Sequence, residues 1–395
     1  MSVGLGHSGR ASLTNRTCSQ RLRVGWRLSG LEFEMTLNNQ PRRTAELRMP
    51  AEWEPHAATW LAWPHYREDW PGKFEPIPWV YAEIIRQLAR REPVELIVTD
   101  RAAEKRARKI LDRAHALSDN VRFHRWPTDR VWTRDSGCTF VTGESASLAA
   151  IEWRFNAWAK YSNWQHDLRI GTLMAQAAGA AEIRPWVKKR HVVLEGGSID
   201  VNGQGSLLTT EECLLSTIQQ RNPGMRRTEY ERLFAKYLGG RNVIWLKSGI
   251  AGDDTHGHID DLARFVAPDV VAIAVESDPK DPNYQPLREN VRRLREATDQ
   301  DGKPLSIIEL PMPAPIFFDQ RRLPASYANF YIANGVVLVP VFNDPNDRFA
   351  LDLLADLFPD REVVGIYAGD LIWGFGAIHC MTQQQPSVGR SSSHD

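Results

Sequence analysis

Residues 198–209 read Ser-Ile-Asp-Val-Asn-Gly-Gln-Gly-Ser-Leu-Leu-Thr. The pattern predicts two short strands, at 198–201 and 206–209, because the Asn-Gly-Gln-Gly segment between them is typical of a hairpin turn. Two neighbouring strands joined in this way are antiparallel. The stretch therefore excludes a sheet made only of parallel strands, at least in this part of the chain.

Farther along the chain, residues 228–238 have the pattern of a helix that ends at Gly239-Gly240, and residues 243–246 form an apolar run typical of a strand. A second hairpin signal, Asn334-Gly335, separates 327–333 from 336–341. We predict further strands at 94–98, 121–126, 192–194, 270–275, 307–310 and 363–366, and further helices at 78–91, 101–115, 167–178, 284–298 and 348–357. The order of two strands, a helix and a strand thus returns several times in an α/β chain.

The composition of the 395 residues is that of an ordinary globular protein, with 42% hydrophobic and 25% charged residues. Lys and Arg balance Asp and Glu at 49 each, which disfavours a general nucleic-acid binder. No apolar run approaches the roughly 20 residues of a membrane helix. The four cysteines form no Cys-x-x-Cys pair, so we expect reduced thiols and a cytoplasmic protein. No glycine-rich phosphate-binding pattern joins a strand to a helix, so no nucleotide site is indicated.

The two ends of the chain differ from its middle. Residues 1–48 contain eight arginines and three acidic residues, and they show no sustained apolar periodicity. We interpret them as a disordered extension or as the product of a misassigned start, with Met35 and Met49 as candidate starts; an organelle transit peptide is a third reading. We expect a single catalytic domain at 49–386 and a disordered, Ser-rich tail at 387–395.

Four segments combine reactive side chains with glycines, at 131–137, 194–198, 252–261 and 374–382. The last contains Cys380, a candidate nucleophile that would attack as its thiolate. Gly374 and Gly376 would let the backbone approach a ligand closely. A buried structural thiol is the simpler alternative. His379 is a poor candidate for the base, since neighbours on a strand point to opposite faces.

The segment 252–261 is the richest in Asp and His. His258 and Asp260 would share one face of an extended segment and could bind a cation and move its protons. Alternatively, His256 and His258 could hold a metal ion in a hydrolase, or the aspartates could cap a helix. The segment by itself leaves these three readings open.

The segment 131–137 adds an aromatic face, Trp132, and another acid, Asp135. Arg134 could simply be the charge partner of Asp135. Alternatively, Asp135 could bind a cationic substrate on which Trp132 packs. Carboxylates, an aromatic face, a histidine and a cysteine together suit a planar guanidinium that is attacked at its central carbon, without a metal.

The ordered motifs resemble those of the agmatine deiminases, in the guanidine-modifying (pentein) superfamily that also holds arginine deiminases and bacterial peptidyl-arginine deiminases. The resemblance runs from Met49 to Pro386. The motifs that carry it are Pro50-Ala51-Glu52-Trp53-Glu54-Pro55-His56, Trp132-Thr133-Arg134-Asp135, Glu195-Gly196-Gly197, Thr210-Glu211-Glu212-Cys213, Arg221-Asn222-Pro223, Gly257-His258-Ile259-Asp260 and His379-Cys380.

This resemblance implies a five-bladed α/β propeller of ββαβ units around a central active site. It implies that Cys380 attacks the guanidinium carbon to form an amidino-cysteine, that His258 transfers protons, and that Asp135 and Asp260 hold the guanidinium nitrogens. Trp132 would pack on the substrate. The implied reaction converts agmatine to N-carbamoylputrescine and ammonia, a step toward polyamines, and needs no cofactor. Glu195 and Asp254 are our candidates for binding the substrate's amine.

Three segments depart from the family pattern: Gly374-Phe375-Gly376-Ala377 before the nucleophile, His256 beside His258, and Ser198 and Asp200 after Gly197. We expect them to reshape the part of the pocket that reads the far end of the substrate. Free arginine, peptidyl arginine or another guanidino-alkyl amine are therefore alternative substrates. A metal-dependent hydrolase built on His256 and His258 and a non-catalytic guanidine-binding protein are alternatives of other classes. We expect no nucleic-acid or membrane partner, and a homo-oligomer stays open.

Overall fold

The computed structural model describes residues 47–143 and 147–389, which belong to one compact unit. Most of the predicted extension, residues 1–46, and residues 390–395 of the predicted tail lie outside the described residues. Within these ranges, none of the helices has both the length and the apolar character that crossing a bilayer requires.

The hairpin at 198–209 belongs to a three-stranded sheet. β9 (Asp200–Val201) pairs antiparallel with β10 (Ser206–Thr210), with Leu207 opposite Val201. The chain then forms α5 (Glu211–Leu215) and α6 (Arg227–Tyr237) and returns as β11 (Asn242–Leu246), parallel to β10. The Asn-Gly turn and the Gly-Gly helix stop thus produce the predicted ββαβ unit.

Four more sheets in the described ranges repeat this order, with an antiparallel pair, a helical crossover and a parallel third strand. One of them consists of β4 (Thr139–Thr142), β5 (Leu148–Ile151), α4 (Ile170–Ala177) and β6 (Ala181–Ile183). The next consists of β12 (Ala263–Ala267), β13 (Val270–Val275), α7 (Tyr284–Glu296) and β14 (Ser306–Pro311). Another consists of β17 (Tyr331–Ala333), β18 (Val336–Val341), α8 (Asn346–Leu357) and β19 (Glu362–Tyr367).

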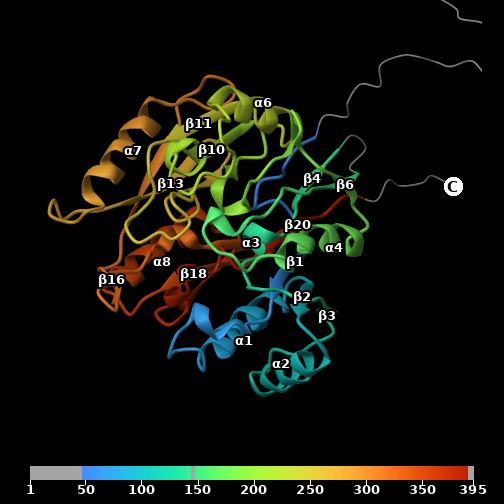
Figure 1. Cartoon of the computed structure of the whole chain (residues 1–395). Coiled ribbons are helices and arrows are strands. Elements are labelled where there is room, and N and C mark those ends of the chain that lie inside the picture. The colour runs from blue at the N-terminus through green and yellow to red at the C-terminus, as the bar shows by residue number, and fades with distance from the viewer. Residues whose placement is uncertain (1–46, 144–146, 390–395) are drawn as a thin grey trace, which may run out of the picture. The chain divides into compact units, whose positions relative to one another are not determined.

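The remaining sheet joins the two ends of the described chain. β20 (Gln383–Pro386) pairs antiparallel with β1 (His56–Ala62), and α1 (Ile77–Leu88) leads to β2 (Val94–Val98), which is parallel to β1. This sheet is extended by α2 (Arg101–Arg113) and β3 (Val121–Arg125). Figure 1 shows β20, in red, beside β1, in blue. The five ββαβ blades confirm the expected propeller.

Most local predictions match the structure closely, and β2, β13 and β18 have the predicted bounds. The predicted strand at 192–194 is wrong, since only an isolated bridge joins Val193 to Arg154. Sequence analysis also missed small elements that depend on tertiary pairing. They include the hairpins β7 (Trp186–Val187) with β8 (Arg190–His191) and β15 (Phe317–Phe318) with β16 (Arg321–Arg322). The blade strands β1, β4, β5, β6, β12 and β20 were not predicted either.

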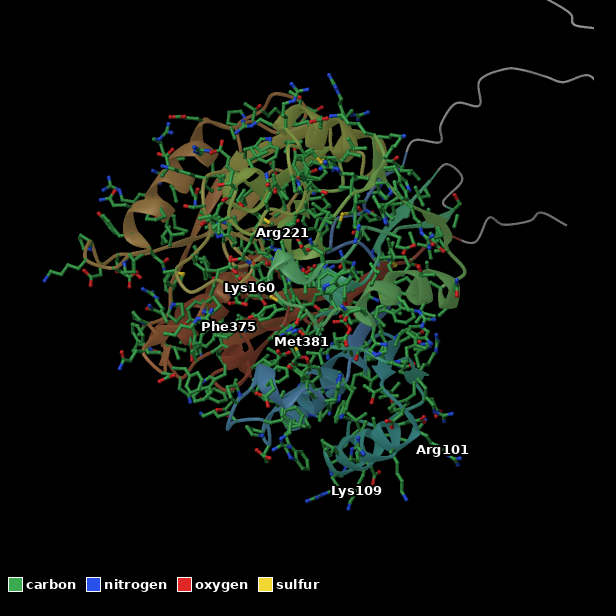
Figure 2. The ribbon with its side chains drawn as sticks, in the orientation of Figure 1. Arg101, Lys109, Lys160, Arg221, Phe375 and Met381 are labelled. Carbon is green, nitrogen blue, oxygen red and sulfur yellow. The ribbon has the colours of Figure 1, made fainter. Side chains whose placement is uncertain are left out.

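Apolar stripes of the helices cover the sheets. In α1, Ile84, Ile85 and Leu88 are fully buried, as their spacing predicts. By contrast, Figure 2 shows Arg101 and Lys109 of α2 extending away from the ribbon, and both are exposed. The blades thereby form a rigid frame that holds the segments leading into their first strands.

Candidate active site

The candidate site is built from the five segments that lead directly into the first strand of each blade. They are α3 (Thr133–Ser136) before β4, the 3-10 turn η5 (Gly196–Ser198) before β9, residues 256–261 before β12, the 3-10 turn η6 (Tyr327–Asn329) before β17, and residues 378–381 before β20. Backbone and side-chain hydrogen bonds tie them together. Gly197 N–H donates to Asp135 (3.0 Å), Asp260 N–H donates to the Gly197 carbonyl (3.3 Å), and His379 N–H donates to the Asn329 carbonyl (3.2 Å).

A cavity of about 640 Å³ opens onto these segments. Cys380, Asp135 and Trp132 are among its lining residues, together with Lys160 and Phe375, which are labelled in Figure 2. The cavity volume suits a small organic ligand.

Cys380 lies in a turn before β20 and is 5% exposed. Its Sγ is 3.1 Å from Nδ2 of Asn329 and 3.7 Å from Oδ2 of Asp260. Burial raises the pKa of the thiol well above its usual range, and the carboxylates of Asp260, Asp261 and Asp135 raise it further. A cation bound in the cavity would oppose these carboxylates and favour the thiolate.

His258 is fully buried between three carboxylates. Its Nδ1 is 3.9 Å from Asp135 and 3.9 Å from Asp260, and its Nε2 is 3.8 Å from Glu195. Neither ring nitrogen has a hydrogen-bond partner among residues 47–143 and 147–389. Burial lowers the pKa of His258, but Asp135, Cys213 and Glu195 outweigh burial and hold the pKa well above its usual value. The ring therefore carries a proton that it can give to a leaving group.

Asp135 lies on α3 with one oxygen accepting from Gly197 and the other from the indole N–H of Trp158 (2.8 Å). Burial raises the pKa of this carboxyl to about 6, with further increases from Asp260 and Glu195, although His258 lowers it. Arg134 does not serve as its charge partner, because its guanidinium instead contacts Gln384 (2.6 Å) and Glu52 (3.2 Å).

Asp260 is fully buried, and its Oδ2 contacts Nδ1 of His379 at 2.7 Å. The other ring nitrogen of His379 contacts Glu52 at 2.8 Å, so the ring fixes the orientation of Asp260. Burial raises the pKa of Asp260, yet His379, His258 and Arg264 bring the net value below its usual range. Oδ1 of Asp260 has no hydrogen-bond partner in the described part of the chain and could accept from a ligand.

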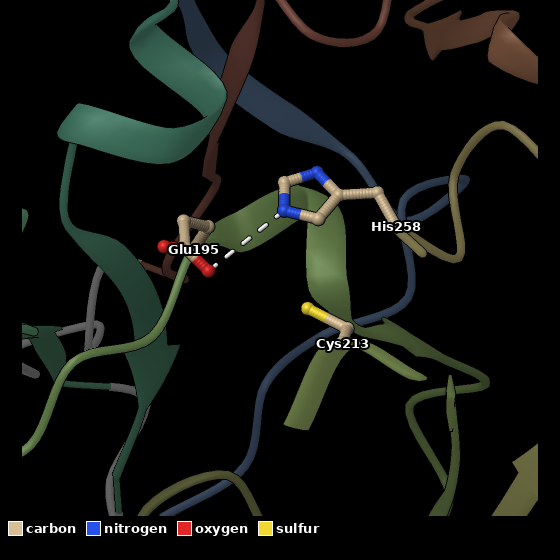
Figure 3. A group of neighbouring side chains, drawn as sticks. All are labelled: Glu195, Cys213 and His258. Carbon is tan, nitrogen blue, oxygen red and sulfur yellow. Dashed lines mark ion pairs between the residues drawn. The ribbon is translucent and has the colours of Figure 1, made fainter. Parts of the chain in front are cut away.

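Glu195 lies beneath His258 and does not line the cavity. Figure 3 shows its carboxylate directed at the His258 ring, with Cys213 on a neighbouring segment. Both oxygens accept from Nε of Arg221, at 3.1 and 3.3 Å, and the pair is buried. Burial raises the pKa of Glu195, but Arg221 and His258 lower it to about 2. The structure thus places Glu195 behind the histidine, away from the position that we expected at the substrate's amine.

Asp254 lines the cavity, and its carboxylate contacts three side chains, two of which are cationic. Lys160 and Nη2 of Arg321 (2.5 Å) contact one oxygen, and the Tyr161 hydroxyl donates to the other (2.5 Å). Burial raises the pKa of Asp254, and these contacts bring it below its usual value. An incoming amine would therefore meet a carboxylate that already has two cationic partners.

Trp132 forms one wall of the cavity and lies against Trp70, with ring centroids 5.7 Å apart. The glycines of the nucleophile loop are required by this wall. A Cβ at Gly376 would lie 2.6 Å from the Trp132 ring, and a Cβ at Gly374 would lie 2.8 Å from Trp70. The close approach predicted for these glycines is therefore made to tryptophan rings, which leaves the sulfur and Trp132 on the same cavity.

The three departures from the family pattern lie in different places. The loop 374–376 lines the cavity, and Phe375 adopts a left-handed backbone with φ of 64° beneath the guanidinium of Arg321. Asp200 contacts Arg264 (2.9 Å), and His256 contacts Ser216 (3.1 Å); neither lines the cavity. Only the first departure thus acts directly on the pocket.

Two groups of side chains have donor atoms close enough to chelate a metal ion: Glu195 with Cys213 and His258, and Asp260 with Asp261 and Cys380. His256 belongs to neither group in the described ranges, so it and His258 do not form the metal pair considered from the sequence. In the first group, Arg221 already neutralises Glu195, which makes it a poor cation ligand.

Sequence analysis overlooked three residues of the site. Gly197 lies so close to the ionisable groups that a Cβ would be 2.5 Å from Nδ1 of His258. His379 orients Asp260, and Asn329 contacts Cys380. Gly197 and His379 stood within quoted motifs, but Asn329 lies in an apolar run that gave no signal.

Comparisons with known proteins identify relatives that match most of this chain. The agmatine deiminase of Pseudomonas aeruginosa (strain LESB58) is 36% identical over 368 residues, covering 87% of this chain and 97% of that protein. The structure of agmatine deiminase from Enterococcus faecalis gives a TM-score of 0.79 at 30% identity, covering 86% of this chain and 96% of that one. A Cys-to-Ser variant of C. jejuni agmatine deiminase with substrate bound gives 0.78 at 29% identity, covering 89% of this chain and all of that one.

A model of a protein family also matches most of this chain. The model for Porphyromonas-type peptidyl-arginine deiminases matches residues 48–386, which include all five blades. Because the match covers most of the chain, the assignment does not rest on a single motif. This chain belongs to the family of Porphyromonas-type peptidyl-arginine deiminases.

Proposed function

We propose that this protein hydrolyses the guanidinium group of agmatine to give N-carbamoylputrescine and ammonia. The observation that carries the proposal is the convergence of four groups: Cys380 and Asp135 line the cavity, Asp260 lies 3.7 Å from Sγ of Cys380, and Nδ1 of His258 lies 3.9 Å from both Asp135 and Asp260. A thiol, a protonated imidazole and two carboxylates match the needs of a planar cation with paired N–H donors. The substrate named for the relatives of this chain supports agmatine.

The first half of the reaction forms a covalent intermediate. Asp135 and Asp260 accept hydrogen bonds from the guanidinium, whose charge favours release of the Cys380 proton to solvent. The sulfur forms a bond with the guanidinium carbon, and His258 gives its proton to one nitrogen. The C–N bond breaks, ammonia leaves, and a positively charged amidino-cysteine remains.

The second half consumes water. His258, now neutral, takes a proton from water as the oxygen attacks the same carbon. The tetrahedral intermediate then loses its hydroxyl proton and expels the sulfur, which regains the proton that it lost at the start. N-carbamoylputrescine leaves, and His258 is again protonated.

The charge of the cavity wall supports a cationic substrate. Five carboxylates line it against three cationic side chains: Glu68, Asp69, Asp135, Asp254 and Asp319 against Arg130, Lys160 and Arg321. Burial raises the pKa of Asp69 to about 7, so this carboxyl is partly protonated at neutral pH, and the other four still outnumber the three cations. The remaining negative excess suits agmatine, which carries a cation at both ends, better than arginine, whose carboxylate would be repelled. We retain Asp254 as the residue that attracts the amine.

The unit that carries the activity is, we infer, residues 49–386, since all five segments of the site lie within it. The cytoplasm is the expected location, because the composition favours reduced thiols.

The decisive experiment is ammonia release by wild type and Cys380→Ala with agmatine, arginine or a blocked arginine peptide, in the presence of a chelator. Cys138→Ala is the matched control, because Cys138 is a buried free thiol that does not line the cavity. We expect release from agmatine by wild type and by the control, and none by Cys380→Ala. Release from an arginine compound alone would refute agmatine as the substrate. Loss of activity in the chelator would instead support a metal-dependent hydrolase.

A further inference from the structure

Asn329 is the fifth blade's contribution to the site, and the reaction steps above do not use it. It ends η6 directly before β17, and it is 1% exposed. The corresponding segments of the other blades provide Asp135, Gly197, His258 with Asp260, and Cys380. A buried amide among these groups must satisfy its hydrogen bonds inside the site.

The orientation of the Asn329 amide is fixed by its neighbours. The backbone N–H groups of His379 and Cys380 point at Oδ1, at 3.0 and 3.4 Å. A peptide N–H can only donate, so the atom that faces both must be the amide oxygen. The NH₂ group consequently faces Oδ1 of Asp261 (2.9 Å) and Sγ of Cys380 (3.1 Å).

The surroundings of the sulfur make this donor important. The ionisable groups that act on Cys380 are Asp260, Asp261, Asp135 and Tyr81, and all of them disfavour a negative sulfur. Among the described residues, Asn329 supplies the side-chain hydrogen bond donated to Sγ, and a backbone hydrogen bond from Ala377 also lowers the pKa of Cys380. A neutral N–H stabilises a thiolate without repelling the guanidinium that must bind next to it.

We propose that Asn329 is a catalytic residue that donates a hydrogen bond to the Cys380 thiolate and holds the 379–380 backbone in place, with Asp261 as the positioning residue for its amide. The inference rests on the proposed function only for the role of Cys380 as nucleophile. A thiolate exists twice in the cycle, before attack on the guanidinium and when the sulfur is expelled. Asn329 stabilises it on both occasions without moving, which is the advantage of a preorganised donor.

The test measures the sulfur itself, apart from turnover. Iodoacetamide alkylates thiolates, so the rate of Cys380 labelling against pH, followed by mass spectrometry of the peptide, reports the pKa of Cys380 in the free protein. Asn329→Ala removes the donor, and Asn329→Asp keeps an oxygen for the backbone N–H groups but turns another oxygen toward the sulfur. We expect the labelling midpoint to move to higher pH in both, and farther in Asn329→Asp.

Turnover should change in a defined way. We expect kcat with agmatine to fall about a hundredfold in both variants, the scale for removal of one preorganised donor, with KM little changed. Asn290→Ala is the matched control, since Asn290 is equally buried and bonds Lys247 N and Ser248 O at 2.7 Å, away from the cavity. It should lower thermal stability and leave the labelling profile unchanged.

An unchanged labelling midpoint in folded Asn329→Asp or Asn329→Ala would overturn the inference. If Asn329→Ala does not fold, Asn329→Asp decides, because it preserves the backbone hydrogen bonds. If the proposed function is wrong, the experiments give a different result. In that case wild type releases no ammonia from agmatine, whereas the effect of Asn329 on Cys380 labelling remains measurable.

Discussion

A carboxylate oxygen of Glu195 lies 3.8 Å from Nε2 of His258, while both Glu195 oxygens accept from the buried Arg221 guanidinium. Burial raises the pKa of Glu195, but Arg221 and His258 lower it to about 2, so the carboxylate stays ionised at neutral pH. Asp135 lies near the other ring nitrogen of His258. The charge of the imidazole is therefore set from both sides by groups brought together from three blades.

Replacing Glu195 by Gln should make His258 a weaker base. The variant loses one of the carboxylates that raise the pKa of His258, so the ring loses its proton at a lower pH. Because His258 must be protonated to release ammonia, the basic limb of the kcat–pH profile should move to lower pH. Arg221 also loses its charged partner, which should cost ~3 kcal/mol of unfolding free energy.

The control is Glu152→Gln, since Glu152 is a nearly buried carboxylate paired with Arg184 outside the cavity. It should leave the kcat–pH profile of wild type intact. A basic limb that stays in place in Glu195→Gln would show that Glu195 does not set the charge of His258.

Replacing Gly197 by Ala should abolish turnover. The new Cβ would lie 2.5 Å from Nδ1 of His258, 3.0 Å from Asp135 and 3.1 Å from Asp260, and none of these groups can move without losing the site geometry. We expect at least a hundredfold loss of kcat/KM, of the order that small displacements of reacting groups produce. Gly365→Ala in β19, with its Cβ 3.1 Å from Val341 of β18, tests for a general effect of added volume. Wild-type kinetics in Gly197→Ala would contradict the arrangement.

Activity should fall as the pH drops through about 6. Burial, with Asp260 and Glu195, raises the pKa of Asp135 to about 6, and below it a proton neutralises the carboxylate that should hold the guanidinium. The acid limb of kcat/KM for agmatine should therefore have its midpoint near that value. Circular dichroism over the same range checks that the protein remains folded. A flat kcat/KM down to pH 5 would argue against a binding role for the Asp135 carboxylate.

Replacing Arg321 by Ala should strengthen agmatine binding. Arg321 contacts Asp254 at 2.5 Å and lies 4.0 Å over the Phe375 ring, so its removal leaves Lys160 as the cationic partner of Asp254 within the described part of the chain. We expect KM for agmatine to fall several-fold and kcat to change little, since an exposed ion pair is worth about 1 kcal/mol or less.

Arg322→Ala is the neighbouring control, because Arg322 pairs with Asp281 and does not line the cavity. Its KM should equal that of wild type. A higher KM for agmatine in Arg321→Ala would mean that Arg321 supports the cavity wall more than it competes with the amine.

Sequence by itself determined many of the helices and strands of this protein and the identity of its reactive groups, although strands such as β1, β4 and β12 were not predicted. Alternation and turn residues are short-range signals, so β2 and β13 could be predicted to the residue. Cys380 and His258 stand in ordered motifs whose resemblance to a family also implied five blades. The predicted strand at 192–194 failed because a three-residue run makes a ladder only if a partner lies beside it.

Only the tertiary structure decided what each charge faces. Glu195 pairs with Arg221 and lies behind His258, Asp254 meets Arg321 from 67 residues away, and Asn329 meets Cys380 across 51 residues. No local pattern encodes such contacts, because they arise when five blades pack and bring the segments before their first strands to one place. The residue types thus specified the chemistry of the site, and the packing of the blades specified which side chains contact one another.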